Sequence, residues 1–282
     1  AETTADTGAE TAAERKARLL APTADFSRAE PFEDLQGGSG TNRERFDHNA
    51  FSLPSAALGF GERSDFFVGN GVFDRPWVAA PSSTIASDGL GPYFNARSCQ
   101  GCHIKDGRGH PPEPGDTNMV SMLFGLSTPE GGPDPVLGAQ FQDQAIAGHA
   151  GEGRITVRYE TEVFTYTDGQ TVELRRPVYE TEADLAPGVS LNPRIAPPMI
   201  GLGLVEAIAE GDILAHADPE DADGDGVSGR PGWLTDGALG RFGWKATTAS
   251  ILEQSAVAFS NDMGLSTRLF PDAWGDCTAA QT

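Results

Sequence analysis

The sequence Arg97-Ser98-Cys99-Gln100-Gly101-Cys102-His103 contains two cysteines separated by two residues and followed directly by a histidine. This spacing is typical of a c-type haem attachment site. Each thiol can add to one vinyl group of haem to form a thioether, and the next histidine can then ligate the iron through an imidazole nitrogen. We therefore expect Cys99 and Cys102 to hold one haem c covalently, with His103 as the proximal iron ligand.

Two other chemistries also use a pair of cysteines at this spacing. A redox dithiol of the thioredoxin type would open a helix in a βαβ unit, a pattern that this sequence does not show. A structural zinc site needs a second pair of ligands at similar spacing, and the sequence has none. The motif therefore favours haem over a dithiol or a zinc site.

The composition is that of a folded protein with many turns. The chain has 282 residues, of which 38% are hydrophobic, and its 35 glycines and 20 prolines predict extensive irregular loops. The formal net charge of −21 argues against a nucleic-acid partner, because phosphates require a positive surface. The same charge permits electrostatic steering of a basic redox partner.

The hydropathy of the chain and its first residues both bear on its cellular location. No apolar run approaches the ~20 residues of a membrane span, so we expect no such span. The chain begins Ala1-Glu2-Thr3-Thr4, without methionine or an apolar leader, as a mature chain would after removal of a signal peptide. Since covalent haem attachment takes place outside the bacterial cytoplasm, we expect a periplasmic protein.

We expect a mainly α fold with extensive loops: a cytochrome c-like haem domain over residues 43–282 after a flexible arm over residues 1–42. A proline at the first helical position predicts a helix over residues 93–102. Apolar stripes predict two further helices, over residues 202–216 and 246–260. Residues 43–90 mix aromatic and turn residues without a long helical period, so loops are expected there.

One β element is also expected within this fold. Ile155, Val157 and Tyr159 alternate with polar residues, and Asp168-Gly169 is typical of a hairpin turn. The pattern predicts a β-hairpin insertion over about residues 154–179. A strand or buried segment is also predicted over residues 119–127.

Three side chains outside the motif are candidates for haem contacts. Arg97 and Arg108 flank it, and arginine suits the carboxylates of the haem propionates, although an ordinary surface charge is the alternative. Met199 is the candidate sixth iron ligand, because Pro197 and Pro198 stiffen the loop that presents it.

Residues 218–229 form an acidic loop that is a candidate calcium site. Asp221, Asp223 and Asp225 have the spacing of the first three ligands of a calcium-binding loop, and the carbonyl of Val227 would be the next ligand. Position twelve carries glycine instead of the bidentate glutamate. The loop is therefore either a calcium site or an acidic turn without an ion.

Longer stretches of the sequence resemble the di-haem oxidoreductase family, whose members are often labelled thiol oxidoreductases and are similar in layout to bacterial di-haem cytochrome c peroxidases. The stretches that carry the resemblance are residues 88–103, 106–109, 194–198, 201–204, 221–226 and 240–246. The resemblance implies a haem c fold with short helices and a β insertion. It also implies a second haem motif, but this sequence has a single Cys-x-x-Cys-His and so resembles the N-terminal haem portion.

Three functions are compatible with these observations. The leading hypothesis is a periplasmic c-type cytochrome, part of a di-haem oxidoreductase, that transfers single electrons to a redox partner protein or a second haem domain. The first alternative is a peroxidase-type catalytic haem with an open sixth position. The second alternative is a calcium-stabilised binding module without haem. The sequence leaves open whether the chain is an enzyme.

Overall fold

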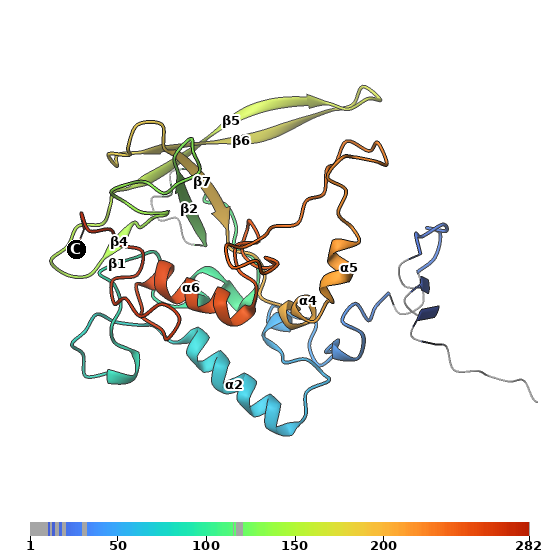
Figure 1. Ribbon diagram of the computed structural model, residues 1–282, viewed down its shortest axis with the longest axis horizontal. Helices are drawn as coiled ribbons and strands as arrows, with labels where there is room; N and C mark the ends of the chain where they lie inside the picture. The colour runs from blue at the N-terminus through green and yellow to red at the C-terminus, as the bar shows by residue number, and fades with distance from the viewer. Residues whose placement is uncertain are drawn as a thin grey trace, which may run out of the picture.

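The computed structural model describes residues 11, 13–14, 17–18, 21–29, 33–114, 116 and 121–281. A β region lies at the top of the view and a helical region below it (Figure 1). Much of the arm predicted over residues 1–42 lies outside the described residues. None of the helices in the described part of the chain has the length and apolar character that a membrane span requires.

The centre of the β region is a three-stranded antiparallel sheet in the order β3-β2-β7. Strand β2, Met122–Ser127, pairs along its whole length with β7, Ser190–Ile195, and also with the short β3, Gln140–Phe141. Side chains of the sheet and of the adjoining hairpin form the larger buried cluster: Met122, Phe124, Leu126, Phe141, Ile155 and Val157. The predicted strand over residues 119–127 is confirmed from Met122 onward, and residues 119 and 120 lie outside the described residues.

The predicted hairpin is also confirmed. Strand β5, Ile155–Thr165, pairs with β6, Thr171–Thr181, from the pair Ile155–Thr181 to the pair Thr165–Thr171. Its base is buried against the sheet through Ile155 and Val157. Its outer half projects away from the body as a two-stranded ribbon (Figure 1), which agrees with the loss of clean alternation beyond Tyr159.

The helical region contains two longer helices, three short ones and several 3-10 turns among the described residues. Its helices are α2 Phe60–Asp74, α3 Cys99–Cys102, α4 Leu202–Glu206, α5 Glu210–Leu214 and α6 Ile251–Met263. Its 3-10 turns are η1 Gly38–Gly40, η2 Ala50–Ser52, η3 Ile85–Ser87 and η4 Ile104–Asp106. A small ladder of β1, Tyr93–Phe94, and β4, Gln144–Ala145, lies beside α6.

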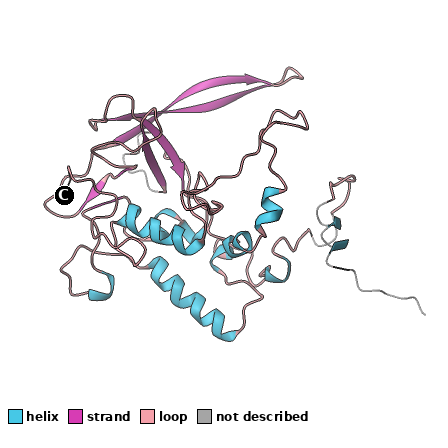
Figure 2. Ribbon diagram, viewed as in Figure 1, coloured by secondary structure: helices cyan, strands magenta, loops and turns pink. Residues whose placement is uncertain are grey.

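The prediction of a mainly α fold was wrong. The chain is 22% helical and 19% strand, with the strands in several sheets (Figure 2). The physical reason is that strands, more than helices, bury the apolar side chains of the core. The larger cluster is built by strands, whereas α2, α3, α4 and α5 contain no fully buried side chain.

Two helix predictions failed for local reasons. The helix expected over residues 93–102 is limited to Cys99–Cys102, because Tyr93 and Phe94 pair as a strand with β4 and Ser98 caps the helix at its start. The helix expected over residues 202–216 is divided into α4 and α5. Helix α2 was not predicted, since Gly61, Gly69 and Gly71 lower the helical propensity of its sequence.

Helix α6 lies slightly later than the predicted range 246–260. It begins after Ser250, whose hydroxyl accepts a hydrogen bond from the Glu253 amide at 3.1 Å, and it ends at Gly264 with a left-handed backbone. Its last residue, Met263, belongs to the second buried cluster. The core members of that cluster are Leu90, Phe94, Met263 and Leu265, and it links α6 to the segment before the cysteines.

Candidate haem site

The cysteine motif forms a single helical turn with defined ends. Ser98 caps α3, because its hydroxyl accepts a hydrogen bond from the Gly101 amide at 3.1 Å. His103 ends the turn, with its amide donating to the Cys99 carbonyl at 2.9 Å. Both Cys99 and Cys102 are half-buried free thiols, so neither is consumed by a disulfide.

The surroundings of the two thiols favour the protonated form. Burial, helped by the nearby Asp262 carboxylate, raises the pKa of both Cys99 and Cys102 to about 11. A reactive redox dithiol needs an environment that lowers the pKa of a thiol. The environment of this pair raises it and therefore does not support that chemistry.

The imidazole of His103 is oriented by a backbone carbonyl. Its Nδ1 lies 2.7 Å from the Pro197 oxygen and donates a hydrogen bond to it, which leaves Nε2 free as a ligand. Burial lowers the pKa of His103, outweighing the opposing effects of this hydrogen bond and of Asp106. A neutral imidazole with one oriented nitrogen is what iron ligation requires.

The carbonyl of Pro197 belongs to residues 196–199, which we call the proximal strap. The strap continues directly from β7, and the Ala196 amide donates to the Ser121 carbonyl at 2.9 Å, just before β2. The Ala196 carbonyl in turn accepts from the Gly109 amide at 2.8 Å. The central sheet thus delivers the strap to the histidine, a contact that the sequence did not indicate except as a Pro-rich stretch.

Met199, the predicted sixth ligand, lies at the end of the strap. Its amide donates to the Asp106 carbonyl at 2.9 Å, and Pro197 two residues earlier contacts His103. These bonds hold the Met199 backbone on the side of the strap and the histidine. Its role as iron ligand stays a prediction that this geometry does not favour.

The two arginines differ in how they are held. Arg97 donates through Nε to the Trp77 carbonyl at 2.9 Å, and its own carbonyl accepts from the Trp77 amide at 2.7 Å. This pairing leaves the terminal guanidinium nitrogens of Arg97 available to a carboxylate. Arg108 is exposed, and among the described residues no hydrogen bond or ion pair holds its side chain. Propionate binding stays a prediction for both.

Two buried polar atoms near the motif lack a protein partner among the described residues. They are Oγ of Ser121 and Oε1 of Gln100, the latter inside the motif itself. Ser121 is 1% exposed and has a positive φ of 64°, an uncommon backbone conformation for serine. Unpaired buried polar atoms are costly, so a bound group that offers partners fits here.

The loop that follows the histidine also fits a large cofactor. A side chain at Gly109 would place its Cβ 2.5 Å from that of Ser121, so glycine permits this close approach. Phe51, Ile104 and Ile200, which adjoin the loop and the strap, are 47%, 46% and 45% exposed. A porphyrin needs a mainly apolar lining, and these side chains could supply part of it. The thiols, the histidine and this lining together fit haem c.

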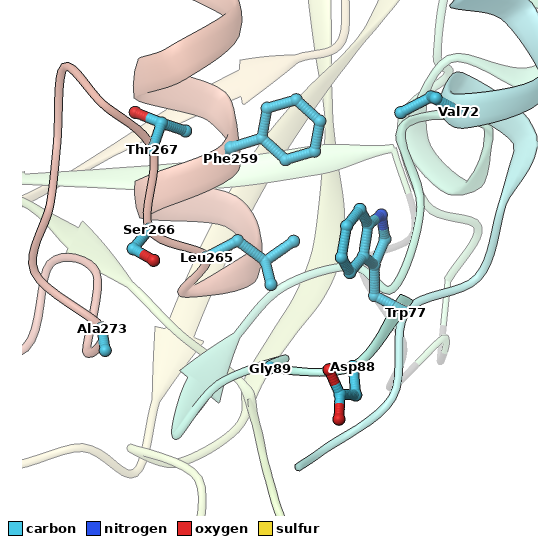
Figure 3. A pocket seen from close by; sticks show the side chains of 9 residues that line it. All are labelled: Val72, Trp77, Asp88, Gly89, Phe259, Leu265, Ser266, Thr267 and Ala273. Atoms are coloured by element: carbon cyan, nitrogen blue, oxygen red, sulfur yellow. The ribbon is translucent and has the colours of Figure 1, made fainter. Parts of the chain in front are cut away.

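An apolar pocket of about 400 Å³ lies near Cys99, since Trp77 and Phe259 of its lining pack against the same buried cluster as that cysteine. The side chains of Trp77, Phe259 and Leu265 face one another across it, and Val72 of α2 closes its upper edge (Figure 3). The buried cluster that includes Leu265 also packs against Cys99. The aromatic content of residues 43–90 was the only sequence signal for this pocket.

The acidic loop brings together a different set of carboxylates from the predicted one. Ligand oxygens of Asp218, Asp221 and Asp223 all lie within 4.8 Å of one another. Asp225 instead accepts a hydrogen bond from the Val227 amide at 2.7 Å. The spacing pattern missed Asp218, because the pattern counts along the chain whereas an isolated bridge between Asp218 and Gly229 closes the loop in space.

The chain matches the family described as "Di-haem oxidoreductase, putative peroxidase" over residues 34–123 and 135–280. The matched ranges contain the cysteine motif, the proximal strap and the acidic loop. No curated protein and no solved structure matches the chain.

Proposed function

The chain belongs to the di-haem oxidoreductase family, and from this premise we propose that it is a periplasmic c-type cytochrome that carries single electrons through one covalently bound haem c. Cys99 and Cys102 form the two thioethers, and His103 ligates the iron through Nε2. A bound haem supplies reversible one-electron redox chemistry at its iron.

The observation that carries the proposal is the hydrogen bond from His103 Nδ1 to the Pro197 carbonyl. Ligating histidines commonly donate their second nitrogen in this way, which sets both the tautomer and the ring orientation. Here a carbonyl from a strap far along the chain meets the histidine of the motif while both cysteines are free thiols. A disulfide function would leave this arrangement unexplained.

The electron partner is proposed from charge and family. The chain carries a net charge of −21, which attracts a basic redox protein and accelerates encounter at low ionic strength. A second haem domain is the other partner consistent with a di-haem family. Arg97 is the residue best placed to hold a propionate, because its Nε is fixed by Trp77 and its outer nitrogens are free.

Haem content tests this proposal directly. The full chain is exported to a periplasm that contains a cytochrome c maturation system, and its intact mass and optical spectrum are recorded. We expect one haem per chain, retained after denaturation, and no covalent haem in the Cys99→Ser, Cys102→Ser double variant. Cys277→Ser is the matched control and should keep its haem. A wild-type chain without haem would refute the proposal and favour a non-haem binding module.

A second candidate function is a peroxidase-type haem with an open sixth position. The observation in its favour is the location of the described methionines. Met122 and Met263 are buried in the two hydrophobic clusters, and Met199 is tied to the side of His103. An iron without a strong sixth ligand can bind peroxide.

Spin state separates the two candidates. A low-spin ferric spectrum that is unchanged by cyanide supports electron transfer with two strong axial ligands. A high-spin spectrum that responds to cyanide or peroxide supports the peroxidase function. If Met199→Leu abolishes a low-spin spectrum, Met199 is the sixth ligand despite its place on the strap.

We also propose that the acidic loop binds calcium. The support is the convergence of Asp218, Asp221 and Asp223, whose mutual repulsion a hard cation would relieve. Calorimetric titration with calcium should show binding by the full chain and a large loss of affinity in Asp223→Asn. Glu182→Gln, an exposed carboxylate elsewhere, is the control. Absence of binding at millimolar calcium would refute this proposal and leave the loop as an acidic turn.

A further inference from the structure

The loop directly after His103 has an unusual backbone. Lys105 and Asp106 both have a φ of +58°, although neither is glycine. Consecutive residues in this region are strained, and such strain persists only where surrounding contacts hold it. It often occurs at functional sites. We call Lys105 and Asp106 the corner, and contacts with other parts of the chain stabilise its backbone.

Side chains of both corner residues are held by the turn η2 and the residue before it. The hydroxyl of Ser52 donates to the Asp106 carboxylate, and Lys105 Nζ donates to Asn49 Oδ1 at 2.6 Å. Phe51 lies beside the next residue, Gly107, where an added Cβ would be 3.7 Å from its ring. Residues 49–52 thus fix the corner from a segment about fifty positions earlier in the chain.

The backbone of Asp106 fixes the two parts of the histidine site. Its amide donates to the His103 carbonyl at 2.9 Å. Its carbonyl accepts from the Met199 amide, also at 2.9 Å, at the end of the proximal strap. Since Pro197 in that strap accepts the hydrogen bond of His103 Nδ1, Asp106 joins the histidine to the strap that orients it.

We propose that Asp106, clasped by Ser52, is a positioning residue that sets the orientation and donor strength of His103 as an iron ligand. The inference rests on the proposed haem function and deepens it. Asp106 itself does not touch the iron. It acts through the strap, because a shift of its carbonyl moves Met199 and with it the Pro197 oxygen.

The test uses the haem-loaded full chain and three variants. Ser52→Ala removes the clasp and keeps the carboxylate, whereas Asp106→Asn keeps an acceptor oxygen and removes the charge. Ser52→Thr retains the hydroxyl and should behave like the wild type. Asp184→Asn, an exposed carboxylate in the connection between β6 and β7, is the control for a simple change of net charge.

Two quantities are measured: the equilibrium constant for haem reduction and the iron–histidine stretching frequency of the ferrous protein. We expect Ser52→Ala to lower the stretching frequency and to change the equilibrium constant by about three- to ten-fold, the size of a modest local electrostatic change. Asp106→Asn should favour the reduced state by a similar factor, with haem content unchanged. If Ser52→Ala leaves both quantities at the wild-type values, the proposal is overturned, even if Asp106→Asn shifts the equilibrium through its charge.

Failure of the haem function is distinguishable from failure of this inference. A wild-type chain without haem refutes the haem function, and the ring-nitrogen NMR shifts of His103 then decide the inference in the same chain. We expect the Nδ1–H tautomer, hydrogen-bonded, in the wild type and Ser52→Thr, and a mixture of tautomers in Ser52→Ala. Identical shifts in all three proteins would overturn the inference.

Discussion

The β region and the helical region of this protein bury their apolar side chains very differently. In the sheet, Phe124 and Phe141 are 3% and 2% exposed, and the buried members of the cluster around them all lie in strands. In the helical region, helix α2 has no fully buried side chain, and Phe67 and Val68 are 55% and 71% exposed. One region completes its own packing and the other does not.

The difference indicates where a cofactor contributes to the fold. A haem supplies a large apolar surface, and side chains that adjoin the histidine are among those left exposed by the protein itself. The sheet is packed without a cofactor, and the strap that orients His103 continues from its strand β7. The stable region therefore positions the ligand, and the incomplete region surrounds the proposed haem. We therefore expect substitutions in the helical region to depend on haem and substitutions in the sheet not to.

The largest effect is expected in the sheet. Phe124→Ala should lower the free energy of unfolding by about 4 kcal/mol, because it removes a buried ring that packs edge-on to Tyr179 at 5.0 Å. Denaturant unfolding, followed by circular dichroism, should give the same loss with and without haem. Phe124→Leu, which keeps most of the volume, should cost about 1 kcal/mol. A loss that depends strongly on haem would contradict an independent sheet.

A matched pair of isoleucines tests the helical region. Ile104 and Ile85 each begin a 3-10 turn and are 46% and 82% exposed. Ile104→Ala should cost about 1 kcal/mol in the haem-loaded chain, since the cofactor would cover that side chain next to His103. Without haem its cost should be near zero.

Ile85→Ala is the control and should have little effect in either form. Thermal unfolding of the wild type and of the two variants, each with and without haem, provides the comparison. If both substitutions behave alike with haem bound, the cofactor does not cover Ile104.

A pH-dependent effect is expected where the last described residues meet the sheet. The Glu152 carboxylate accepts hydrogen bonds from the Gln142 amide at 2.6 Å and from the Gln281 side chain at 2.5 Å. Burial, with the charges of Asp276 and Asp134 adding to it, raises the pKa of Glu152 to about 7. The folded state therefore binds this proton more tightly than the unfolded state, whose pKa is near 4.5.

The resulting stability is fully present below pH 4.5 and is lost as the pH rises through about 7. Glu152→Gln should remove this dependence and raise the free energy of unfolding at pH 8 by about 1 kcal/mol, a value reduced for partial exposure to water. Denaturant unfolding at pH 5 and pH 8 measures it. An unchanged pH dependence in the variant would show that ionisation of the Glu152 carboxylate costs the folded state little free energy.

The smallest effect is expected at the outer half of the hairpin. Val163 is 61% exposed there, and Val163→Thr should change the free energy of unfolding by less than about 0.5 kcal/mol, with or without haem. Val157→Thr, at the buried base of the same strand, is the comparison and should cost more than about 1 kcal/mol. Equal costs would mean that the outer half is packed in solution.

What the sequence predicted correctly depends on short-range patterns. The hairpin follows from alternation that ends at a recognisable turn at Asp168-Gly169, whereas the haem-binding role of the cysteine motif stays a prediction. The helix over residues 93–102 was wrong over its first half, because the pairing of Tyr93 and Phe94 with β4 overrides local propensity. Helix α2 was missed for a different reason, because its glycines weaken the helical signal of the sequence.

The contacts that orient the site could not be predicted, because they join distant segments. The bond between His103 and Pro197 spans 94 positions, and that between Ser52 and Asp106 spans 54. Proline-rich composition near residue 197 was visible, but it was interpreted as support for Met199. The hydrogen bond from His103 to Pro197 shows that the strap lies against the histidine, and the pairing of β2 with β7 holds the strand from which the strap continues.

Hydrogen–deuterium exchange, measured by mass spectrometry on the haem-loaded chain and on the Cys99→Ser, Cys102→Ser variant, tests the central claim most directly. We predict that α2, α3 and the proximal strap lose protection when haem is absent, while β2, β3 and β7 keep theirs. Equal loss of protection in the sheet and in the helical region, or no loss in either, would contradict the claim that haem completes the helical region.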